Sequence, residues 1–353
     1  MKEKFKKLNQ VFKKKKVDAL LITSEENRFY LSGFTGSAGC LFITPKQRYI
    51  LSDFRYWEQI SKECKGFNLI KIDRDGQFDG IRGILKKFPR IKKVGFEDDK
   101  VSFAGYKKLK KELSKVKLIP LEGAVTQLRE IKSKEEIQYI KKAADIANKA
   151  LANVLKVIKP GVTEKFVASL LQMEMKMLGA EKESFDIIVA SGPNGALPHA
   201  KPGNRKIRKD DLIVIDFGAK YNGYCSDMTR TICLGKKSPK QKKIYDIVAR
   251  AQKAALDYIK SGRVCGDVDN KARGLIEKEG YGKEFGHGLG HGIGIEVHES
   301  PSFRPNVKDV LRPGMILSVE PGIYLSGFAG VRIEDLVLIT KDGYENLTKN
   351  SKK

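Results

Sequence analysis

The stretch DLIVIDFGAKYNGYCSDMTRTI (211–232) consists of two hydrophobic segments on either side of Asn222–Gly223. This dipeptide strongly favours a two-residue type I′ turn, so the stretch predicts a β-hairpin. The run LIVI (212–215) before the turn is typical of a strand that is buried on both faces. The hairpin is therefore expected inside the protein rather than at an exposed sheet edge.

Each strand of this hairpin carries an acidic residue, Asp216 in one and Asp227 in the other. With Asn222–Gly223 as the turn, Asp216 pairs with Thr229, and Asp227 lies two positions along on the same face. Diagonal neighbours of this kind lie about 7–8 Å apart, so both carboxylates can reach one ion. Because an unpaired buried carboxylate is costly, acids usually converge in this way around a metal. The hairpin therefore predicts a metal site.

Histidines gather in the same half of the chain. The chain has four, which are His199 in LPHAKP and His287, His291 and His298 in HGLGHGIGIEVHE (287–299). A lone histidine is usually a packed or surface residue, but all four lie beside glycine- or proline-rich loops. The glycines between them let the backbone approach a site closely. This distribution indicates a functional role.

Two further acids, Glu320 in SVEPG and Glu334 in RIEDL, lie on strand-like segments. A loop containing Gly327 and Gly330 separates these segments, so we expect a second hairpin that faces the first. Asp335 should point to the opposite face from Glu334 if the strand is regular, and it is left out of the ligand set. Four carboxylates and one imidazole then converge, as in a two-metal hydrolytic site.

The order of these residues resembles that of the pita-bread metallopeptidases, in particular the proline-specific branch of prolidase and Xaa-Pro aminopeptidase. The stretch HGLGHGIGIEVHE is similar to the histidine signature of that branch, and FYLSGFTGSAG (29–39) is similar to a creatinase-type N-terminal domain. The resemblance covers nearly the whole chain. The metal ligands that it implies are Asp216, Asp227, His291, Glu320 and Glu334.

By this resemblance, Asp216 binds the first metal bidentately. Asp227 and Glu334 bridge the two ions, and His291 and Glu320 complete the second. Oxygen-rich ligation with one imidazole suits Mn²⁺, with Co²⁺, Zn²⁺ and Fe²⁺ as alternatives. Two divalent ions would generate a bridging hydroxide and polarise the scissile carbonyl.

The resemblance also implies roles for residues around the metals. The expected catalytic residues are Glu320, His298, His199 and Arg332, and the expected substrate-binding residues are His199, His287, His298, Tyr324 and Arg332. Glu320 would handle a proton as well as bind metal. Arg332 and Tyr324 would orient Glu334 and shape the substrate pocket.

The expected activity is hydrolysis of the bond between an N-terminal residue and proline, in the manner of an Xaa-Pro aminopeptidase. A prolidase restricted to Xaa-Pro dipeptides is the alternative. The expected partners are short peptides with proline at the second position and a second copy of the chain in a homodimer. A non-catalytic binding protein and creatinase are disfavoured by the intact ligand set. Methionine aminopeptidase is disfavoured by the additional N-terminal domain and the VHE continuation of the histidine motif.

The composition narrows the remaining classes. The net charge is +25, but the lysines occur in short runs without an arginine-rich arm or a nucleic-acid motif, which argues against a nucleic-acid partner. No apolar stretch approaches the length of about 20 residues that a membrane span needs. The N-terminal residues lack the apolar run of a secretory signal. Five cysteines without CxxC spacing favour reduced thiols and a cytoplasmic location.

The length of 353 residues favours about two domains, and we expect an α+β protein. Residues 1–125 are predicted to form a creatinase-like α/β domain with a mixed sheet. Residues 126–353 are predicted to form a pita-bread domain with a curved, mainly antiparallel sheet flanked by helices. The segment LIPLEGAV (118–125) is the predicted linker, and NRFYLSGFTGSAG (27–39) is predicted as a loop after a strand.

The predicted elements follow from periodicity and end signals. Strands are expected at 18–23, 40–44, 48–52, 67–72 and 93–97, with helices around 54–64, 78–88 and 102–115. Ser133 and Glu136 form a capping box that should begin a long helix ending near 158. Further helices are expected after Thr163, over about 239–260 and over about 266–279.

Overall fold

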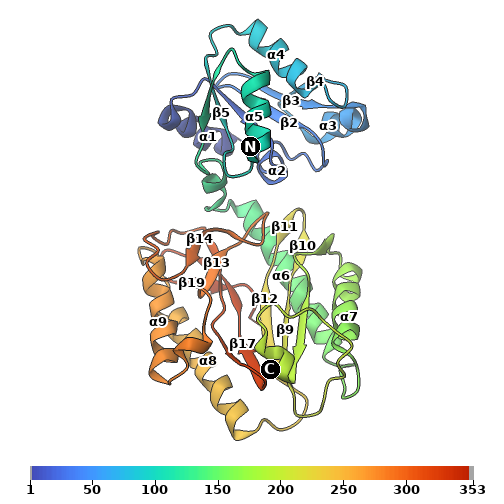
Figure 1. Ribbon diagram of the computed structural model, residues 1–353, viewed down its shortest axis with the longest axis vertical. Helices are drawn as coiled ribbons and strands as arrows, with labels where there is room; N and C mark the ends of the chain where they lie inside the picture. Colours follow the sequence, from blue (N-terminus) through green and yellow to red (C-terminus); the bar gives the residue numbers. More distant parts are fainter. Residues whose placement is uncertain (1, 350–353) are drawn as a thin grey trace. The chain divides into compact units, whose positions relative to one another are not determined.

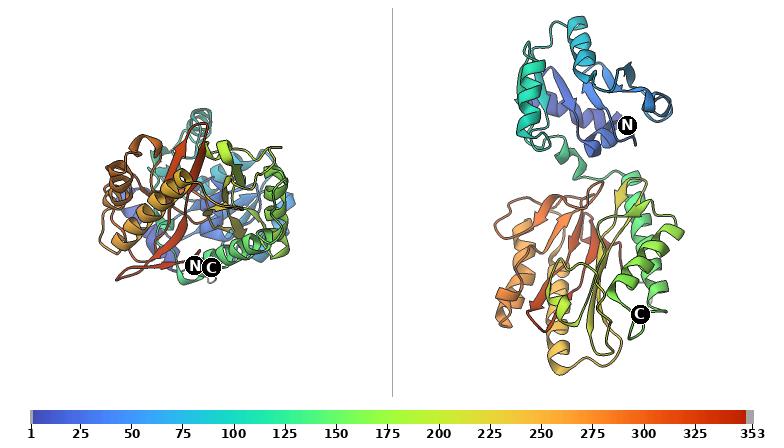
Figure 2. Two further views of the ribbon diagram at one scale, coloured as in Figure 1. Left: turned by 90° about the horizontal axis from the view of Figure 1, so that it is seen from below. Right: turned by 45° about the vertical axis from the view of Figure 1, so that its right-hand side comes forward.

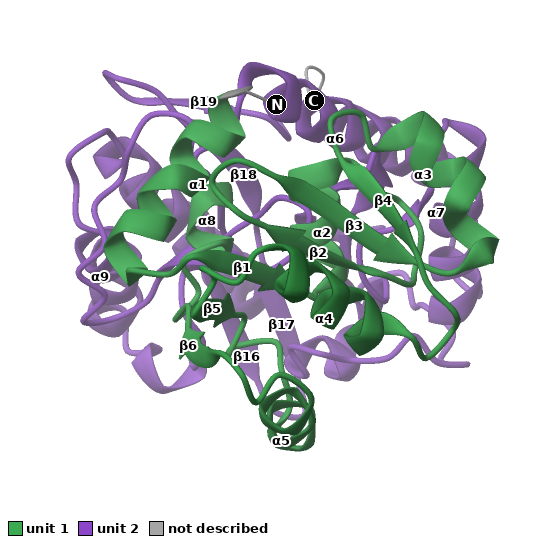
Figure 3. Ribbon diagram, turned by 90° about the horizontal axis from the view of Figure 1, so that it is seen from above, with its two compact units in different colours: residues 1–129 green, residues 130–353 purple. Residues whose placement is uncertain are grey.

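The computed structural model describes residues 2–349. The chain divides into two compact units, Met1–Arg129 and Glu130–Lys353, which Figure 3 colours separately. The sequence predicts this boundary after residue 125. Among the helices of the described residues, none combines the length and the apolar character needed to cross a membrane.

The first unit is built on a mixed sheet, as the sequence predicts (Figure 1). Its order among the described residues is β4-β3-β2-β1-β5-β6. The pairs β1–β2 and β2–β3 are antiparallel, and the other pairs are parallel. The strands are β1 (Ala19–Ile22), β2 (Cys40–Ile43), β3 (Arg48–Ser52), β4 (Asn68–Lys71), β5 (Lys93–Phe96) and β6 (Lys117–Pro120).

Helices pack around this sheet and bury its apolar side chains. They are α1 (Lys2–Lys15), α2 (Glu25–Ser32), α3 (Trp57–Glu63), α4 (Gln77–Lys87) and α5 (Phe103–Glu112), with 3₁₀ turns η1 (Phe54–Tyr56) and η2 (Thr126–Arg129). Buried residues such as Leu21, Phe42 and Ile81 form the core of the unit. The fold therefore arises from alternating strands and amphipathic helices.

Two sequence assignments in this unit are wrong. The stretch 27–39 is not wholly a loop, because its first half lies in α2, where the Ser24 hydroxyl caps the helix. Gly33, with a φ of 78°, ends that helix in the left-handed conformation that glycine adopts readily. The predicted linker 118–125 begins inside β6, whose apolar residues pair with β5 at the sheet edge. A proline at the end of an edge strand is permitted, so it does not prevent this pairing.

The helices of the second unit lie on the outside of its sheets. They are α6 (Lys134–Val154), α7 (Glu164–Met177), α8 (Pro239–Tyr258) and α9 (Cys265–Lys278), with 3₁₀ turns η3 (Gly192–Ala196) and η4 (Gly282–Glu284). Figures 1 and 2 show α6 and α7 on one side of the strands and α8 and α9 on the other. The predicted capping box of Ser133 and Glu136 is confirmed. The helix that this box begins, α6, ends at Val154, which is before the predicted end near 158. The residues that follow Val154 form turns.

The strands of the second unit pair antiparallel throughout its described residues, as expected. The sheets are β12-β9-β8, β11-β10-β7, β14-β13-β15-β18-β19 and β16-β17. The strands are β7 (Lys182–Glu183), β8 (Ile188–Ser191), β9 (Leu212–Phe217), β10 (Ala219–Tyr221), β11 (Tyr224–Cys225), β12 (Met228–Cys233), β13 (Gly290–Gly292), β14 (Glu299–Phe303), β15 (Ile316–Val319), β16 (Gly322–Leu325), β17 (Ala329–Arg332), β18 (Asp335–Ile339) and β19 (Tyr344–Asn346).

The predicted register of the first hairpin is confirmed, since Asp216 pairs with Thr229. Its two long strands are nevertheless interrupted, between β9 and β10 on one side and between β11 and β12 on the other. A Cβ atom on Gly218 would lie 1.9 Å from the Ser226 carbonyl oxygen, so only glycine allows this close approach. Asp227 follows Ser226 directly and lies where the partner strand is interrupted.

The second hairpin is formed by β16 and β17, with Gly322 opposite Arg332. Gly327 lies in its turn with a φ of 70°, but Gly330 lies in β17, which corrects its predicted place in the loop. The reason is close packing, because a Cβ atom on Gly330 would lie 1.8 Å from the Gly195 carbonyl oxygen. The acids of the second hairpin lie outside this ladder, in the gaps that separate it from β15 and β18.

Candidate metal centre

Three of the five predicted ligands come together closely. Single ligand atoms of Asp227, His291 and Glu334 all lie within 4.8 Å of one another. The His291 Nε2 atom is also 3.3 Å from Glu320 Oε1. Because His291 Nδ1 lies 3.0 Å from the Gly292 carbonyl oxygen, the ring proton belongs on Nδ1, which leaves Nε2 able to bind a cation.

Asp216 is connected to this group through Arg332. The Arg332 Nη2 atom donates to Asp216 Oδ2 at 2.5 Å, and the Arg332 side chain is 4% exposed. The bidentate role that the resemblance implies needs both carboxylate oxygens, whereas here one of them accepts a hydrogen bond from arginine. The other oxygen, Oδ1, is buried and has no hydrogen-bond partner among residues 2–349.

Three buried carboxylate oxygens of the cluster lack a partner in the described part of the chain. They are Asp216 Oδ1, Asp227 Oδ1 and Glu334 Oε1. A buried anionic oxygen without a donor or a cation is costly, so the arrangement calls for positive charge between these atoms. Carboxylates with one imidazole form a donor set that suits divalent transition metals. The residues therefore fit the divalent ions that the sequence predicts.

The electrostatics of the cluster agree with this fit. Burial, together with repulsion from neighbouring carboxylates, raises the pKa of Asp227 and of Glu334 well above their usual values. Burial has the same effect on Glu320, but the hydrogen bond and charge of His291 outweigh it and lower the pKa of Glu320 to about 2. Ionising these carboxyls together at one buried point is therefore unfavourable, and a bound cation would stabilise their anionic forms.

Two hydroxyl residues that the sequence reasoning missed position the acids. The Thr229 hydroxyl donates to Glu334 Oε2 at 2.7 Å and accepts from Arg332 Nε at 3.2 Å. The Ser318 hydroxyl donates to Glu320 Oε1 at 3.1 Å and accepts from the backbone N–H of His291 at 3.0 Å. A signal existed for Thr229, since the predicted register already places it opposite Asp216.

A hydrogen-bond chain joins three of the predicted substrate-site residues. Arg332 Nη1 donates to the Tyr324 hydroxyl at 2.8 Å, and this hydroxyl lies 2.9 Å from His287 Nε2. The Nδ1 atom of His287 lies 2.8 Å from the Gly288 carbonyl oxygen, so the neutral ring carries its proton there and accepts from Tyr324. Burial lowers the pKa of His287 and raises that of Tyr324 to about 12, which keeps both groups neutral.

The two remaining histidines, His199 and His298, are more exposed than His287. The His298 ring packs edge-on against His291, with 4.3 Å between ring centroids. Burial against this neighbour and the charges of His291 and His199 lower the pKa of His298. His199 is exposed on the loop after η3. Among the described residues, neither histidine belongs to the group of close ligand atoms that Asp227, His291 and Glu334 form.

Two neighbouring acids have other partners. Glu299 is paired with Lys132 at 3.2 Å, with both side chains 2% exposed, and it accepts from the backbone N–H of Ile295 at 2.9 Å. Asp335 accepts from Arg230 at 2.8 Å and from the Thr348 hydroxyl at 3.0 Å. Asp335 therefore bonds to residues outside the predicted ligand set.

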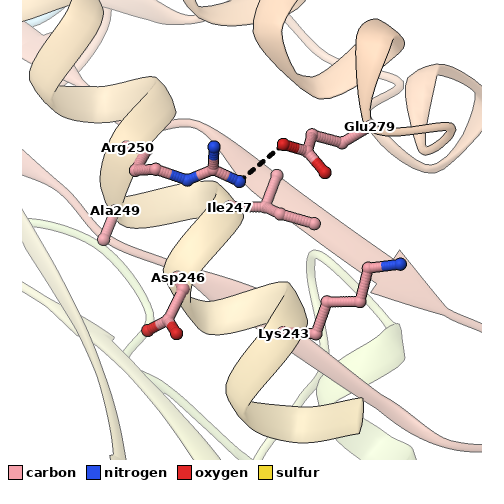
Figure 4. Close-up of a pocket in the computed structure, with 6 residues that line it drawn as sticks. All are labelled: Lys243, Asp246, Ile247, Ala249, Arg250 and Glu279. Carbon is pink, nitrogen blue, oxygen red and sulfur yellow. Dashed lines mark hydrogen bonds and ion pairs between the residues drawn. The ribbon is translucent and has the colours of Figure 1, made fainter.

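A separate hollow of about 570 Å³ lies on the surface between α8 and the end of α9 (Figure 4). The Arg250 and Glu279 side chains pair across it at 2.6 Å. Its lining residues are Lys243, Asp246, Ile247, Ala249, Arg250 and Glu279. None of the predicted site residues belongs to this lining, so the hollow is no part of the candidate metal centre.

Comparisons with known proteins show which families the two units resemble. Residues 138–341 match the model of metallopeptidase family M24, and residues 4–131 match the creatinase/prolidase N-terminal domain. The Xaa-Pro dipeptidase of Pyrococcus horikoshii is 39% identical over 352 residues, which cover 100% of this chain and 98% of the relative.

Two solved structures show the same architecture. The Xaa-Pro dipeptidase from Bacillus anthracis superposes with a TM-score of 0.95 at 42% identity, covering 99% of this chain and 98% of that one. The X-Pro aminopeptidase from Thermotoga maritima gives a TM-score of 0.90 at 36% identity, covering 98% and 99%. A protein named Xaa-Pro dipeptidase and one named X-Pro aminopeptidase therefore share this two-unit fold.

Proposed function

The chain belongs to metallopeptidase family M24 and carries a creatinase/prolidase N-terminal domain, and from this premise we propose that it is an Xaa-Pro dipeptidase. The sequence reading puts Xaa-Pro aminopeptidase first. The names of the relatives favour the dipeptidase, since Xaa-Pro dipeptidases of two Pyrococcus species match at 39% and 38% identity over the whole chain. The similarity to the Thermotoga aminopeptidase keeps the longer-peptide activity as the second candidate.

The three partnerless carboxylate oxygens are the observation that carries the proposal. We propose that Asp216, Asp227, His291, Glu320 and Glu334 hold two divalent ions, with Mn²⁺ first and Co²⁺, Zn²⁺ or Fe²⁺ as alternatives. When bound, ions of this kind activate water and polarise the scissile carbonyl. The acids supply the negative charge that balances two such cations.

The chain's own side chains divide the remaining tasks. Glu320 is the least buried of the four acids, and we propose that its carboxylate accepts a proton during the reaction and returns it to the leaving amine. We propose that His298 and His199, which are both exposed, donate hydrogen bonds to the substrate or to the oxyanion. Arg332 and Tyr324 keep Asp216 and His287 in place.

The substrate class follows from the chemistry of proline. An Xaa-Pro amide has no N–H, so a site for it must recognise the carbonyl and the rigid ring instead.

We further propose that the protein forms a homodimer and is located in the cytoplasm. The five cysteines are all free thiols, which supports a reducing location.

The decisive experiment compares hydrolysis of Ala-Pro, Ala-Pro-Ala and Ala-Ala by the full chain with added Mn²⁺, with and without a chelator. Chelator-sensitive turnover of Ala-Pro alone is the expected result. Turnover of Ala-Pro-Ala would transfer the assignment to an Xaa-Pro aminopeptidase. If neither proline peptide is hydrolysed, the proposed substrate class is wrong.

A further inference from the structure

A buried carboxylate outside the acid cluster gathers an unusual set of donors. Glu164, the first residue of α7, is fully buried. Its Oε1 accepts from the backbone N–H of Ser191 and from the Ser191 hydroxyl, both at 2.7 Å. Its Oε2 accepts from the backbone N–H of Gly203 at 3.2 Å. The Asn194 side-chain amide lies 3.1 Å from both oxygens.

All these donors belong to one segment of chain. The residues between Ser191 and Gly203 include η3 and then the loop that carries His199. Glu164 therefore ties both ends of this segment, and its interior through Asn194, to the start of a helix. Negative charge at a helix N-terminus is itself favourable, so this anchor is stabilised from both sides.

The same segment is also held from the side of the candidate metal centre. Arg332 Nη1 donates to the Pro198 carbonyl oxygen at 3.3 Å, next to His199. Gly195 packs directly on Gly330 of β17, where a Cβ atom on Gly330 would lie 1.8 Å from the Gly195 carbonyl oxygen. The loop thus lies between a fixed carboxylate and the arginine that binds Asp216.

We propose that Glu164 is a positioning residue that fixes His199 for the substrate by anchoring residues 191–203. The part of this proposal that concerns turnover rests on the proposed peptidase function, whereas the anchoring does not. His199 is exposed, and within residues 2–349 it has no hydrogen bond comparable to that between His287 and Tyr324. Its location therefore depends on the backbone that carries it.

The Glu164→Gln variant separates charge and acceptor capacity from side-chain size. An amide nitrogen cannot accept a hydrogen bond, so one set of backbone donors in the segment would face another donor. A buried donor without an acceptor costs much more than the net value of one hydrogen bond. The segment is expected to loosen, while the acid cluster keeps its hydrogen bonds with Arg332, Thr229 and Ser318.

The first measurement is hydrogen–deuterium exchange across residues 191–203, together with metal content after loading with Mn²⁺. In Glu164→Gln, we expect exchange in this segment to accelerate by about tenfold or more, with unchanged metal content. Glu183→Gln is the matched control, because Glu183 accepts from Gln172 and, among the described residues, forms no hydrogen bond with the segment. Unchanged exchange in Glu164→Gln would overturn the anchoring, whatever the peptidase assays give.

The second measurement is the kinetics of Ala-Pro hydrolysis in a double-mutant cycle. Glu164→Gln should lower kcat/KM by about 10- to 100-fold in the wild-type background. In a His199→Ala background the same change should add less than about twofold, because its effect passes through His199. Equal losses in both backgrounds would show a general structural role and refute the positioning of His199.

A second variant keeps the test open if Glu164→Gln does not fold. Asn194→Ala removes one tie but leaves Glu164 its other donors, so the buried carboxylate remains satisfied. Asn194→Ala should also accelerate exchange in residues 191–203 and lower kcat/KM through His199, but both effects should be smaller than in Glu164→Gln. Faster exchange without any coupling to His199 would again contradict the proposal.

Discussion

Thr229 and Glu334 hold each other through both side chain and backbone. The Thr229 hydroxyl donates to Glu334 Oε2 at 2.7 Å, and the backbone N–H of Glu334 donates to the Thr229 carbonyl oxygen at 3.1 Å. Since Thr229 is also the register partner of Asp216, this one residue couples acids from the two hairpins.

Thr229→Ala should therefore weaken the metal centre without removing a ligand. Loss of an outer hydrogen bond to a ligand typically costs about 10- to 100-fold in metal affinity or activity, and we expect a loss of that size. Thr229→Ser keeps the hydroxyl and should stay near wild type. Metal titration and kcat/KM measure both variants, and an unaffected Thr229→Ala variant would show that this bond is dispensable.

Variants of the neighbouring acids Glu334 and Asp335 should differ sharply in metal content. Glu334→Gln and Asp227→Ala should each lose bound metal and activity together, because each removes a proposed bridging carboxylate. Asp335→Asn should retain metal, since Asp335 is bonded to Arg230 and Thr348 instead. Elemental analysis of the purified variants decides, and retained turnover in Asp227→Ala would refute the two-ion proposal.

Two histidine rings in contact should also separate by metal content. His298→Ala should keep its metal near the wild-type level and lower kcat/KM by about 100-fold or more, as expected for lost stabilisation of the oxyanion. His291→Ala should lose metal, although its ring centroid lies 4.3 Å from that of His298. Metal loss in His298→Ala would mean that the ligand set is misassigned.

The buried pair Lys132–Glu299 should matter for stability. Removing one partner of a buried ion pair typically costs about 3–5 kcal/mol, because the other charge remains buried without compensation. We expect Lys132→Met to lower the free energy of unfolding by that amount, and Lys132→Met with Glu299→Gln to recover part of it. The exposed Lys253 pairs with Asp257, and Lys253→Met should leave urea unfolding nearly unchanged.

The pH dependence of His287 has a defined sign. Burial lowers the pKa of His287 below its ordinary value of 6.5. As the pH falls through 6.5, the unfolded chain binds a proton that the folded chain does not, so folding stability decreases. Histidine NMR signals of Zn²⁺-loaded protein should show the rings of His287 and His298 titrating below 6.5, and His287→Gln should remove one of these two signals. A midpoint at or above 6.5 would contradict the assignment of a neutral ring.

Much of the site was accessible from sequence because local chemistry fixes the hairpin register. The Asn222–Gly223 turn places Asp216 opposite Thr229 without any knowledge of the rest of the fold. The strand interruptions were not accessible, because they depend on contacts such as that of Gly218 with the Ser226 carbonyl. The hydrogen bond between Arg332 and Asp216 was not accessible either, because it also depends on tertiary contacts.

The contact of Arg332 with Asp216 joins residues that are far apart in the chain, and only the packing of two sheets brings them together. Likewise, the place of Gly330 in a strand follows from its contact with Gly195 and not from its neighbours in sequence. Periodicity predicted the strands and helices, but it could not predict which side chain occupies a carboxylate oxygen.

The interruptions of the strands also bear on how the protein reaches its active form. The candidate ligands come from separate strands or from the gaps between strands, spread from Asp216 to Glu334. Contacts so distant in sequence form late in folding, because long chain loops must close first. A partly folded chain therefore cannot assemble the ligand set, and metal uptake would report that the second unit has completed its maturation.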